Sequence, residues 1–236
     1  MRSQELPLER YDTDKVRNGL IQVYDLLLAP WVDRPVVLLE IGVYRGGSLL
    51  LWRDYFPQGI IVGLDVRLPQ DFPPTERVFL FQGDQTDTAF LSWVARQVAP
   101  QGFDIIIDDA SHIGEYTKRA FWHLFDHHLK PGGLYAIEDW GTGYWDDWPD
   151  GKSLDLSLYE SQGPPPDLAR SPHDPRWKHP WPNHSYGMVG FIKQLIDEQG
   201  ALDATRKNLK GRPQRSSKFE SMFITTGLVC IRKARR

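Results

Sequence analysis

Two apolar runs in the middle of the chain each stop in a pair of acidic residues. The first is FDIIIDDASH at positions 103–112, and the second is GGLYAIEDW at positions 132–140. A short apolar run that ends in polar residues is typical of a buried parallel strand, whose last residues reach the carboxyl edge of the sheet. The two runs therefore predict an α/β protein with its chemistry at that edge.

The acidic pairs bring four carboxylates and one imidazole to the same predicted edge. These side chains belong to Asp108, Asp109, His112, Glu138 and Asp139. Carboxylates that share a crevice raise one another's pKa unless a cation or hydrogen-bond donors compensate, and this number of oxygen ligands favours a hard divalent ion such as Mg²⁺. The competing interpretation is that Asp108 or Asp139, taken alone, caps a following helix. Two acidic pairs on consecutive strands are harder to explain in that way.

Composition narrows the class of protein. The 236 residues, 41% hydrophobic and 25% charged, suit one large α/β domain covering 1–236. A net charge of -3 and a pI near 6.2 provide no basic surface, so we expect no nucleic-acid or membrane partner. The single cysteine, Cys230, fits a reducing compartment, and neither a signal peptide nor a membrane span is expected. A cytoplasmic protein is the prediction.

The first part of the chain predicts a helix, a strand and a glycine-rich turn. Residues 15–29 form an amphipathic pattern, with Thr13 or Asp14 as its cap. The run VVLLEIGV then reads as the first central strand, followed by the turn at 42–47 and another helix. Glycines between a strand and a helix allow a ligand close to the backbone. The turn is not a dinucleotide fingerprint, because Tyr44 stands where that pattern needs glycine.

Two further strands end in polar residues. The run at 60–65 stops at Asp65, where an acid can accept hydrogen bonds from both hydroxyls of a ribose. The run at 79–82 is closed by Gly83, Asp84 and Gln85. Asp84 could face a ligand or could only cap the next helix.

The remaining pattern completes the fold class. Helices are predicted at 87–98 and 114–129, with a turn at 130–133, and a periodic helix begins at Met188. Two alternating runs about Thr226-Gly227 predict a hairpin. We therefore expect a doubly wound, mostly parallel, seven-stranded Rossmann-like sheet with a C-terminal antiparallel hairpin.

Residues 141–185 lack periodicity and predict a lid-like insertion. This stretch holds four of the nine tryptophans and eight of the eighteen prolines. Long ordered loops in compact domains tend to be functional, although contact between subunits is the alternative. We expect an acceptor pocket walled mainly by Trp145 and Trp148. The full set of predicted substrate contacts is Trp140, Tyr144, Trp145, Trp148 and His184.

The motifs YDTDK, LLEIGVYRGGSLLLW, GDQTD, FDIIIDDASH and LKPGGLYAIED together carry a family resemblance over residues 11–140. Their order resembles class I S-adenosylmethionine-dependent methyltransferases. More narrowly, the motifs resemble the metal-dependent sugar O-methyltransferases of the macrocin and mycinamicin type and the related cephalosporin hydroxylase-like proteins. The resemblance implies S-adenosylmethionine and Mg²⁺ as cofactors. It also implies a small-molecule acceptor, which we expect to be a glycoside because members of that family methylate sugars.

The resemblance also implies roles for individual residues. It implies Asp109, Glu138 and Asp139 as the ligands of Mg²⁺. It implies His112 as the catalytic base, with Asp109 beside it in the catalytic group. Side chains alternate along a strand, so Asp108 and Asp109 should serve different ligands. By the same rule, both acids of the second pair reach one ion only if the chain has left the strand by Asp139. The implied cofactor contacts are Glu40, Gly42, Tyr44, Gly46, Ser48, Asp65, Asp84, Gln85 and Asp108.

The sequence departs from the family pattern at three places. Ala110 stands where the family usually has glycine, and the segment GTGYWDDWPDG at 141–151 matches only in part. We also expect no counterpart of the long N-terminal extension that some macrolide enzymes carry. These departures leave the acceptor and the oligomeric state open, with a homo-oligomer as one option.

The expected activity is Mg²⁺-dependent O-methylation of a sugar or glycosylated natural product. The ion would bind the acceptor hydroxyl and lower its pKa, and His112 would take the proton. His112 could instead only orient an acid, and His184 could only cap a helix. Two rival functions are a metal-dependent hydroxylase or hydrolase and a non-catalytic S-adenosylmethionine-binding module. The hydroxylase is weakened because no two-histidine, one-carboxylate pattern is evident.

Overall fold

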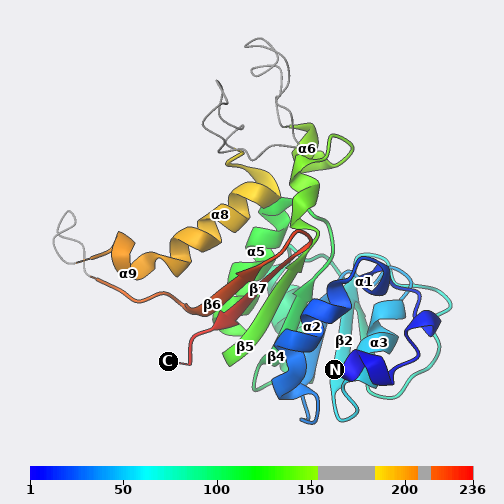
Figure 1. Ribbon diagram of the computed structural model, residues 1–236. Coiled ribbons are helices and arrows are strands. Elements are labelled where there is room, and N and C mark those ends of the chain that lie inside the picture. The colour runs from blue at the N-terminus through cyan, green and yellow to red at the C-terminus, as the bar shows by residue number, and fades with distance from the viewer. Residues whose placement is uncertain (154–183, 207–213, 236) are drawn as a thin grey trace.

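The computed structural model describes residues 1–153, 184–206 and 214–235 (Figure 1). Its centre is a seven-stranded sheet in the order β3-β2-β1-β4-β5-β7-β6. The strands β3, β2, β1, β4 and β5 run parallel, while β7 is antiparallel to both β5 and β6. The strands are β1 (Val37–Ile41), β2 (Ile60–Asp65), β3 (Val78–Gln82), β4 (Phe103–Asp108), β5 (Leu129–Glu138), β6 (Phe219–Ile224) and β7 (Leu228–Lys233). This arrangement confirms the predicted fold class, including the hairpin about Thr226-Gly227.

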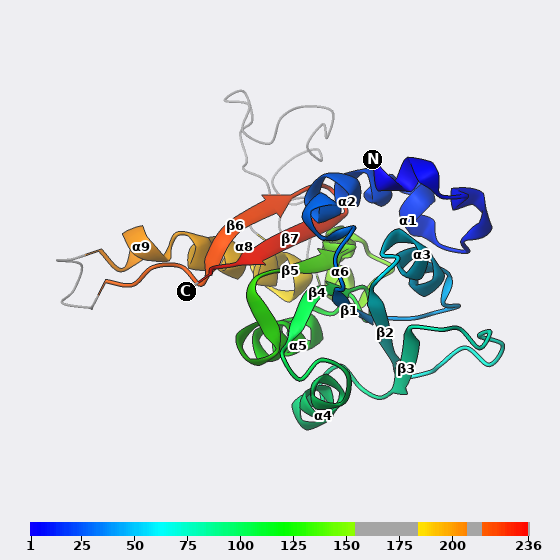
Figure 2. The ribbon, with the colours of Figure 1, turned by 90° about the horizontal axis from the view of Figure 1, so that it is seen from below.

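Helices cover both faces of the sheet (Figure 2). One face packs against α1 (Asp14–Arg17), α2 (Leu20–Leu28) and α3 (Gly47–Tyr55). The other packs against α4 (Thr88–Val98), α5 (Gly114–His127) and α8 (Gly187–Gln199). Shorter elements are η1 (Arg2–Glu5), η2 (Leu8–Arg10), η3 (Ala29–Trp31), η4 (Trp140–Tyr144), α6 (Pro149–Lys152) and α9 (Ala201–Ala204). No helix in the described part of the chain is long and apolar enough to cross a membrane.

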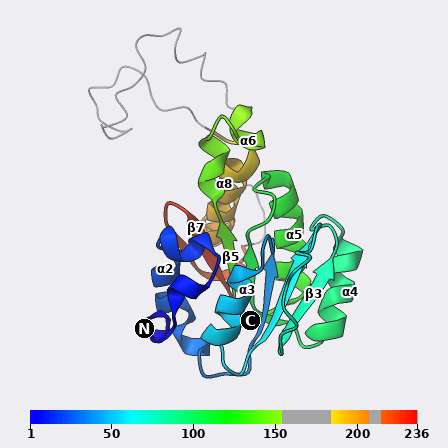
Figure 3. The ribbon, with the colours of Figure 1, turned by 90° about the vertical axis from the view of Figure 1, so that its right-hand side faces the viewer.

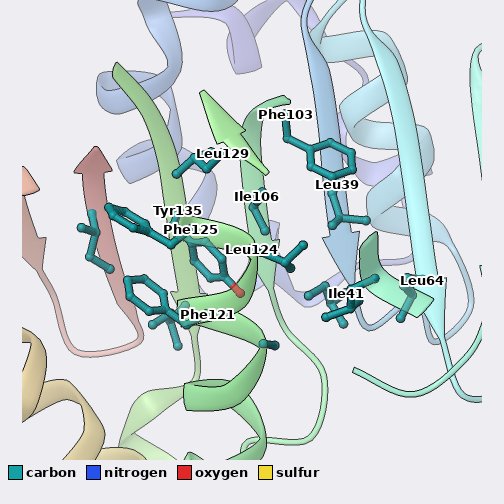
Figure 4. Packing of buried hydrophobic residues seen from close by; sticks show 14 of the residues in the cluster. Leu39, Ile41, Leu64, Phe103, Ile106, Phe121, Leu124, Phe125, Leu129 and Tyr135 are labelled. Atoms are coloured by element: carbon teal, nitrogen blue, oxygen red, sulfur yellow. The ribbon is translucent and has the colours of Figure 1, made fainter. Parts of the chain in front are cut away.

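The period of two along each strand divides the core into two clusters. On the α5 side, Phe121 and Phe125 pack with Ile106 and Tyr135, and the ring centroids of Phe121 and Tyr135 lie 4.7 Å apart (Figure 4). Residues one step along the same strands, such as Ile107, point to the α2 and α3 side. The polar residue that ends a strand therefore faces whichever helix layer its position in this alternation dictates.

The segment 15–29, predicted as one helix, is two helices. Gly19 has φ 75° and separates α1 from α2, because this left-handed conformation cannot continue a right-handed helix. Thr13 is the cap of α1, and its side chain accepts a hydrogen bond from Lys15 N at 3.3 Å. The break lets α1 approach the sheet from its own direction, and the Lys15 side chain is completely buried.

The turn predicted at 130–133 lies inside β5. The register is irregular there: Phe103 pairs with Leu129, whereas Ile105 pairs with Leu134. The extra residues on β5 are accommodated with Gly132 at φ 75°. The sequence correctly indicated a local irregularity, but the strand continues through it.

Candidate active site

A cleft of about 850 Å³ opens at the carboxyl edge of the parallel strands. This volume lies within the range of small-molecule sites. Its walls come from the segment 12–17, the turn after β1, the ends of β2 and β3, and the loop after β4, with Asp139 and Trp148 contributing from the far side. Figure 3 shows α6 beyond one end of the sheet. Most of the polar residues predicted from the strand ends therefore do meet at one place.

The turn after β1 is built so that only glycine fits at key positions. Gly42 has φ 96°, and a Cβ there would overlap the carbonyl of Asp109. A Cβ on Gly47 would overlap the carbonyl of Asp12. These close approaches hold the loop after β4 and the N-terminal segment against the turn. Gly42, Tyr44 and Ser48 line the cleft or its floor as predicted for cofactor contacts, and their cofactor role stays a prediction.

Gly46 packs against a side chain, whereas Gly42 and Gly47 pack against backbone carbonyls. It has φ 82°, and a side chain there would overlap the ring of Phe72. Gly46 caps the start of α3 and does not belong to the cleft wall. Its predicted cofactor role would have to act through the shape of the turn.

Asp65, at the end of β2, both lines the cleft and organises the turn. Its Oδ2 accepts hydrogen bonds from Val43 N at 2.7 Å and Tyr44 N at 3.3 Å, and its Oδ1 accepts one from Arg67 N at 3.0 Å. The carboxylate therefore ties the ends of β1 and β2 together. Its predicted contact with a ribose stays a prediction, and one carboxylate would serve both purposes.

Asp84 and Gln85 lie where β3 ends and both line the cleft. Asp84 Oδ1 accepts hydrogen bonds from the backbone N and the hydroxyl of Thr86 at 2.7 and 2.8 Å, which lowers the pKa of Asp84. The cap of α4 is Asp87, so the helix-cap interpretation does not apply to Asp84. Gln85 is buried, with Nε2 3.5 Å from Asp108 Oδ1.

Asp108 is buried on the α5 side of the sheet, 2% exposed, and does not line the cleft. Tyr135 donates a hydrogen bond from its hydroxyl to Asp108 Oδ2 at 3.3 Å. Burial raises the pKa of Asp108 to about 7, and the hydrogen bond from Tyr135 only partly opposes that rise. Contact of Asp108 with the cofactor stays a prediction, and its side chain contacts one cleft residue, Gln85.

Lys15 lies at the centre of a group of three carboxylates on the opposite face. Its Nζ is 2.6 Å from Asp109 Oδ2, 2.8 Å from Glu138 Oε2 and 3.2 Å from Glu40 Oε1. Burial alone would lower the pKa of Lys15, but Glu138, Asp109 and Glu40 outweigh it and raise that pKa well above the usual value. Lys15 therefore carries a full positive charge inside the protein.

The two glutamates of this group have further donors. Tyr24 donates to Glu138 Oε1 at 2.6 Å, and Ser48 donates to Glu40 Oε2 at 2.8 Å. Burial raises the pKa of Glu138 to about 8 and also raises that of Glu40. The ammonium of Lys15 lowers both pKa values, but it does not cancel the effect of burial. Neither Lys15 nor Tyr24 was identified as a site residue from the sequence. The only signal was the place of Lys15 in the YDTDK motif.

A second group, open to the cleft, contains Asp109, His112 and Asp139. One ligand atom from each lies within 4.8 Å of the others, and His112 Nε2 is 3.8 Å from Asp109 Oδ1. His112 and Asp139 have φ 52° and 51°, which are uncommon values for residues other than glycine. The chain has thus left β5 by Asp139. Burial, followed by the charge of Asp109, raises the pKa of Asp139.

The predicted magnesium ligands are divided between the two groups. Asp109 belongs to both, Glu138 belongs to the group around Lys15, and Asp139 belongs to the cleft group. Two carboxylates beside the cleft fit Mg²⁺, which prefers oxygen ligands and keeps positions for water or substrate. The contribution of Glu138 as a ligand stays a prediction, since its two oxygens already face Lys15 and Tyr24.

Of the predicted aromatic contacts, Trp148 is the one that lines the cleft. Its ring meets that of His112 edge to face, with centroids 5.0 Å apart. Trp145 is 55% exposed outside the cleft. Trp140 Nε1 donates to Thr225 O at 2.8 Å, which ties η4 to the hairpin. Residues 154–183, most of the predicted lid, lie outside the described residues.

His184 contacts η4 from the interior of the protein. It is buried, its Nε2 lies 2.6 Å from Gly143 O, and its ring lies 5.3 Å from that of Tyr144. Burial lowers the pKa of His184. Neither His184 nor Tyr144 lines the cleft, so contact with an acceptor stays a prediction for both.

Asp150 is a residue that the sequence analysis missed. Its Oδ2 accepts hydrogen bonds from Gly114 N at 2.8 Å and Met188 N at 2.7 Å. It therefore joins α6 to the first residues of α5 and α8. Because Gly114 follows soon after His112, this bridge links the position of α6 to the cleft.

Comparisons with known proteins find relatives both by sequence and by structure. No protein-family model matches the chain. The mycinamicin VI 2''-O-methyltransferase of Micromonospora griseorubida is 43% identical over 129 residues, which are 52% of this chain and 31% of that protein. The demethylmacrocin O-methyltransferase of Streptomyces fradiae is 36% identical over 199 residues, 76% of this chain and 49% of that protein.

A solved structure shares the fold of this chain. The mycinamicin-pathway methyltransferase MycE, in complex with Mg and SAH, superimposes with a TM-score of 0.68 and 30% identity over 91% of this chain and 49% of its own. This chain therefore spans at most about half the length of the relatives that it matches.

Proposed function

We propose, from the premise that this chain has the class I S-adenosylmethionine-dependent methyltransferase fold and is a homologue of the sugar O-methyltransferases of natural-product pathways, that it methylates a hydroxyl group of a glycoside with the help of Mg²⁺. The observation that carries this proposal is the group of Asp109, His112 and Asp139 at the wall of the cleft. It combines two oxygen ligands with an imidazole within 4.8 Å.

S-adenosylmethionine would occupy the part of the cleft between the turn after β1 and the ends of β2 and β3. The glycine backbone of that turn leaves room for close approach, and Asp65 holds it in place from the end of β2. Asp84 and Gln85 form the adjoining wall. This arrangement would bring the cofactor beside the loop that carries Asp109, since Gly42 is in contact with that loop.

Asp109 and Asp139 would hold the ion on the neighbouring wall. S-adenosylmethionine supplies the methyl group, and Mg²⁺ supplies a Lewis acid that lowers the pKa of an acceptor hydroxyl. Asp109 can reach the ion with Oδ1 because its Oδ2 is engaged by Lys15 at 2.6 Å. The strained backbone at Asp139 turns that carboxylate away from the strand and toward the cleft.

His112 would accept the proton of the acceptor hydroxyl. Its side chain is only 10% exposed and packs edge to face against Trp148, which limits the orientations of the ring. Nε2 faces Asp109 Oδ1 at 3.8 Å, so the carboxylate is close enough to stabilise the imidazolium that forms. A histidine with this orientation can serve as base without leaving the wall of the cleft.

The acceptor would enter beside Trp148, opposite the cofactor. The relatives that the chain matches are named as methyltransferases of mycinamicin VI and demethylmacrocin. An aromatic wall next to two carboxylates suits a polyhydroxylated ring, because its apolar face packs on indole and its hydroxyls reach polar groups.

The test is transfer of a labelled methyl group from S-adenosylmethionine to a panel of 6-deoxyhexosides, with the purified chain in Mg²⁺ and then in EDTA. We expect turnover of at least one glycoside in Mg²⁺, loss of turnover in EDTA, and recovery when Mg²⁺ is restored. Calorimetric titration with S-adenosylmethionine should show binding in both conditions.

Two outcomes would contradict the proposal. Transfer that continues undiminished in EDTA would remove the ion from the mechanism. Cofactor binding without transfer to any glycoside, in the presence of Mg²⁺, would favour the non-catalytic binding module, whereas absence of cofactor binding would favour the metal-dependent hydroxylase or hydrolase.

A further inference from the structure

Lys15 is buried in a way that is rare for lysine. In the described part of the chain it is the one lysine whose side chain is completely shielded from solvent. Its Nζ contacts Glu40, Asp109 and Glu138 within 3.2 Å. A charge in such a place is retained only if its partners compensate for the loss of water.

The segment that carries Lys15 is anchored at the two positions just before Asp14 and Lys15. Thr13 caps α1 just before it, and the carbonyl of Asp12 packs directly against Gly47 at the start of α3. Both contacts involve backbone atoms, so the direction in which Lys15 enters the protein is determined by the fold. The ammonium is therefore held at the carboxylates and does not depend on a flexible segment.

Asp109 connects Lys15 to the cleft group. Its Oδ2 accepts a hydrogen bond from Lys15 Nζ at 2.6 Å, while its Oδ1 faces His112 Nε2 at 3.8 Å. One carboxylate thus belongs to both groups of three ligand-type side chains that the described residues form. Any change in the charge behind Asp109 must alter how its other oxygen is presented to the cleft.

The group around Lys15 would itself suit a cation of higher charge. Glu40, Asp109 and Glu138 offer oxygen atoms within 4.8 Å of one another, which is the ligand type that Mg²⁺ and Mn²⁺ prefer. The ammonium already lies among these oxygens. Without it, three carboxylates would face one another in a buried space, and a divalent ion would relieve their repulsion.

We infer that Lys15 is a positioning residue, a built-in cation that takes the place of a second metal ion behind the active site. It keeps the Glu40, Asp109 and Glu138 group closed to divalent ions and holds Asp109 with one oxygen toward the cleft. The inference deepens the proposed function and rests on it for the divalent ion at the cleft. It concerns this chain's own ammonium, which can be tested with a metal alone.

The experiment measures Mn²⁺ binding to the full chain without cofactor or acceptor, by calorimetry and electron paramagnetic resonance. The wild type should bind one Mn²⁺ per chain. Lys15→Met should bind two, and because Asp109 is shared by both groups, the two ions should give an exchange-coupled spectrum that the wild type lacks. A residue with a merely structural role would not raise the number of ions.

Two further variants sharpen the result. Lys15→Met combined with Glu40→Gln removes one charge of each sign, and it should return binding to about one Mn²⁺ because the second group loses a ligand. Lys130→Met is the matched control, since Lys130 pairs with Asp104 at 2.8 Å at the other end of the strands and should leave Mn²⁺ binding at one per chain.

Folding of the variant is part of the test. The melting temperature of Lys15→Met should be low in EDTA and should rise on addition of Mn²⁺ at least twice as much as that of the wild type. A Lys15→Met protein that stays at one Mn²⁺, or that fails to fold even with Mn²⁺ present, would overturn the inference. Failure of the proposed function is distinct: it would appear as absence of methyl transfer in the wild type, whatever the Mn²⁺ count of Lys15→Met.

Discussion

The acidic pairs that end β4 and β5 look alike in the sequence but are stabilised in opposite ways. The first acid of each pair, Asp108 or Glu138, is the last residue of its strand and is buried. Asp108 faces neutral donors, Tyr135 and Gln85, whereas Glu138 faces the ammonium of Lys15. Both acids have a raised pKa, but the partners of Asp108 are neutral donors, whereas Glu138 also contacts a buried cation.

The register of the sheet explains this difference. Asp108 pairs with Ile137 across β4 and β5, so these two residues share the α5 side of the sheet. Glu138 is one position further and therefore points to the other side, where Glu40, paired with Ile107, also points. An offset of one residue thus decides which acid meets Lys15. The second acids, Asp109 and Asp139, lie beyond their strands and face the cleft.

The largest expected effect is on the rate of methyl transfer, and it distinguishes Asp109, the second acid after β4, from Asp108, the first. Asp109→Asn should lower the rate of methyl transfer at least about 1,000-fold, or about 4 kcal/mol in the barrier, because it removes a charged ligand from the cleft. Its affinity for S-adenosylmethionine should change less than about threefold, well under 1 kcal/mol. The measurements are steady-state kinetics and calorimetry.

Asp108→Asn is the matched control for that prediction. The two aspartates are adjacent, but Asp108 does not line the cleft, so the rate should fall by less than about tenfold, or 1.4 kcal/mol. A loss of rate as large as that of Asp109→Asn would show that the comparison between buried and cleft-facing acids is wrong.

The second prediction concerns stability and pH. The pKa of Asp108 is raised from 3.8 to about 7, so the folded protein keeps a proton that the unfolded chain releases between these values. The free energy of unfolding should therefore fall as pH rises from about 4 to 7, and Asp108→Asn should remove up to about 4 kcal/mol of that fall. Urea unfolding of both proteins at several pH values measures the difference.

Equal pH dependence in wild type and Asp108→Asn would contradict the raised pKa. Well below pH 3.8 the two proteins should have nearly equal stability, because the carboxyl is then protonated in both the folded and the unfolded chain. That comparison at low pH controls for any packing change caused by the amide.

The third prediction uses a matched pair of buried tyrosines. Tyr24 donates to Glu138 at 2.6 Å, and Tyr135 donates to Asp108 at 3.3 Å. Tyr24→Phe should lower the free energy of unfolding by about 1 to 3 kcal/mol, because it leaves a buried acceptor without its short hydrogen bond, and Tyr135→Phe by only about 0.5 to 1.5 kcal/mol, because its bond is longer. Urea unfolding at pH 7 is the measurement. Equal losses of stability would mean that the shorter hydrogen bond to Glu138 contributes no more than the longer one to Asp108.

The smallest expected effect is on the KM for the acceptor, and it concerns Trp148, which lines the cleft together with Asp109 and Asp139. Trp148→Leu should raise the KM for the acceptor by about 2- to 12-fold, corresponding to the 0.5 to 1.5 kcal/mol of an aromatic contact. Trp145→Leu, in the same segment but 55% exposed outside the cleft, should leave the KM unchanged. If the two variants behaved alike, Trp148 would not be the wall of the acceptor pocket.

Local patterns were sufficient for most of the fold and for the place of the site. Apolar runs of strand length, the glycine turn at 42–47 and the alternation about Thr226-Gly227 predict elements that the structure contains. The turn predicted at 130–133 was wrong because a strand can absorb extra residues as a bulge when its neighbour continues to pair. The predicted lid at 141–185 stays a prediction, since most of it lies outside the described residues.

By itself, the sequence determined that acids from several strands meet at one edge, because parallel strands present their carboxyl ends together. Only the tertiary structure decided how those acids are compensated. Lys15 reaches Glu138 across more than a hundred positions of the chain, through a helix break at Gly19 and a one-residue offset between β4 and β5. Periodicity specifies which residues share a face of one element, but contacts between distant elements depend on how those faces are packed against each other.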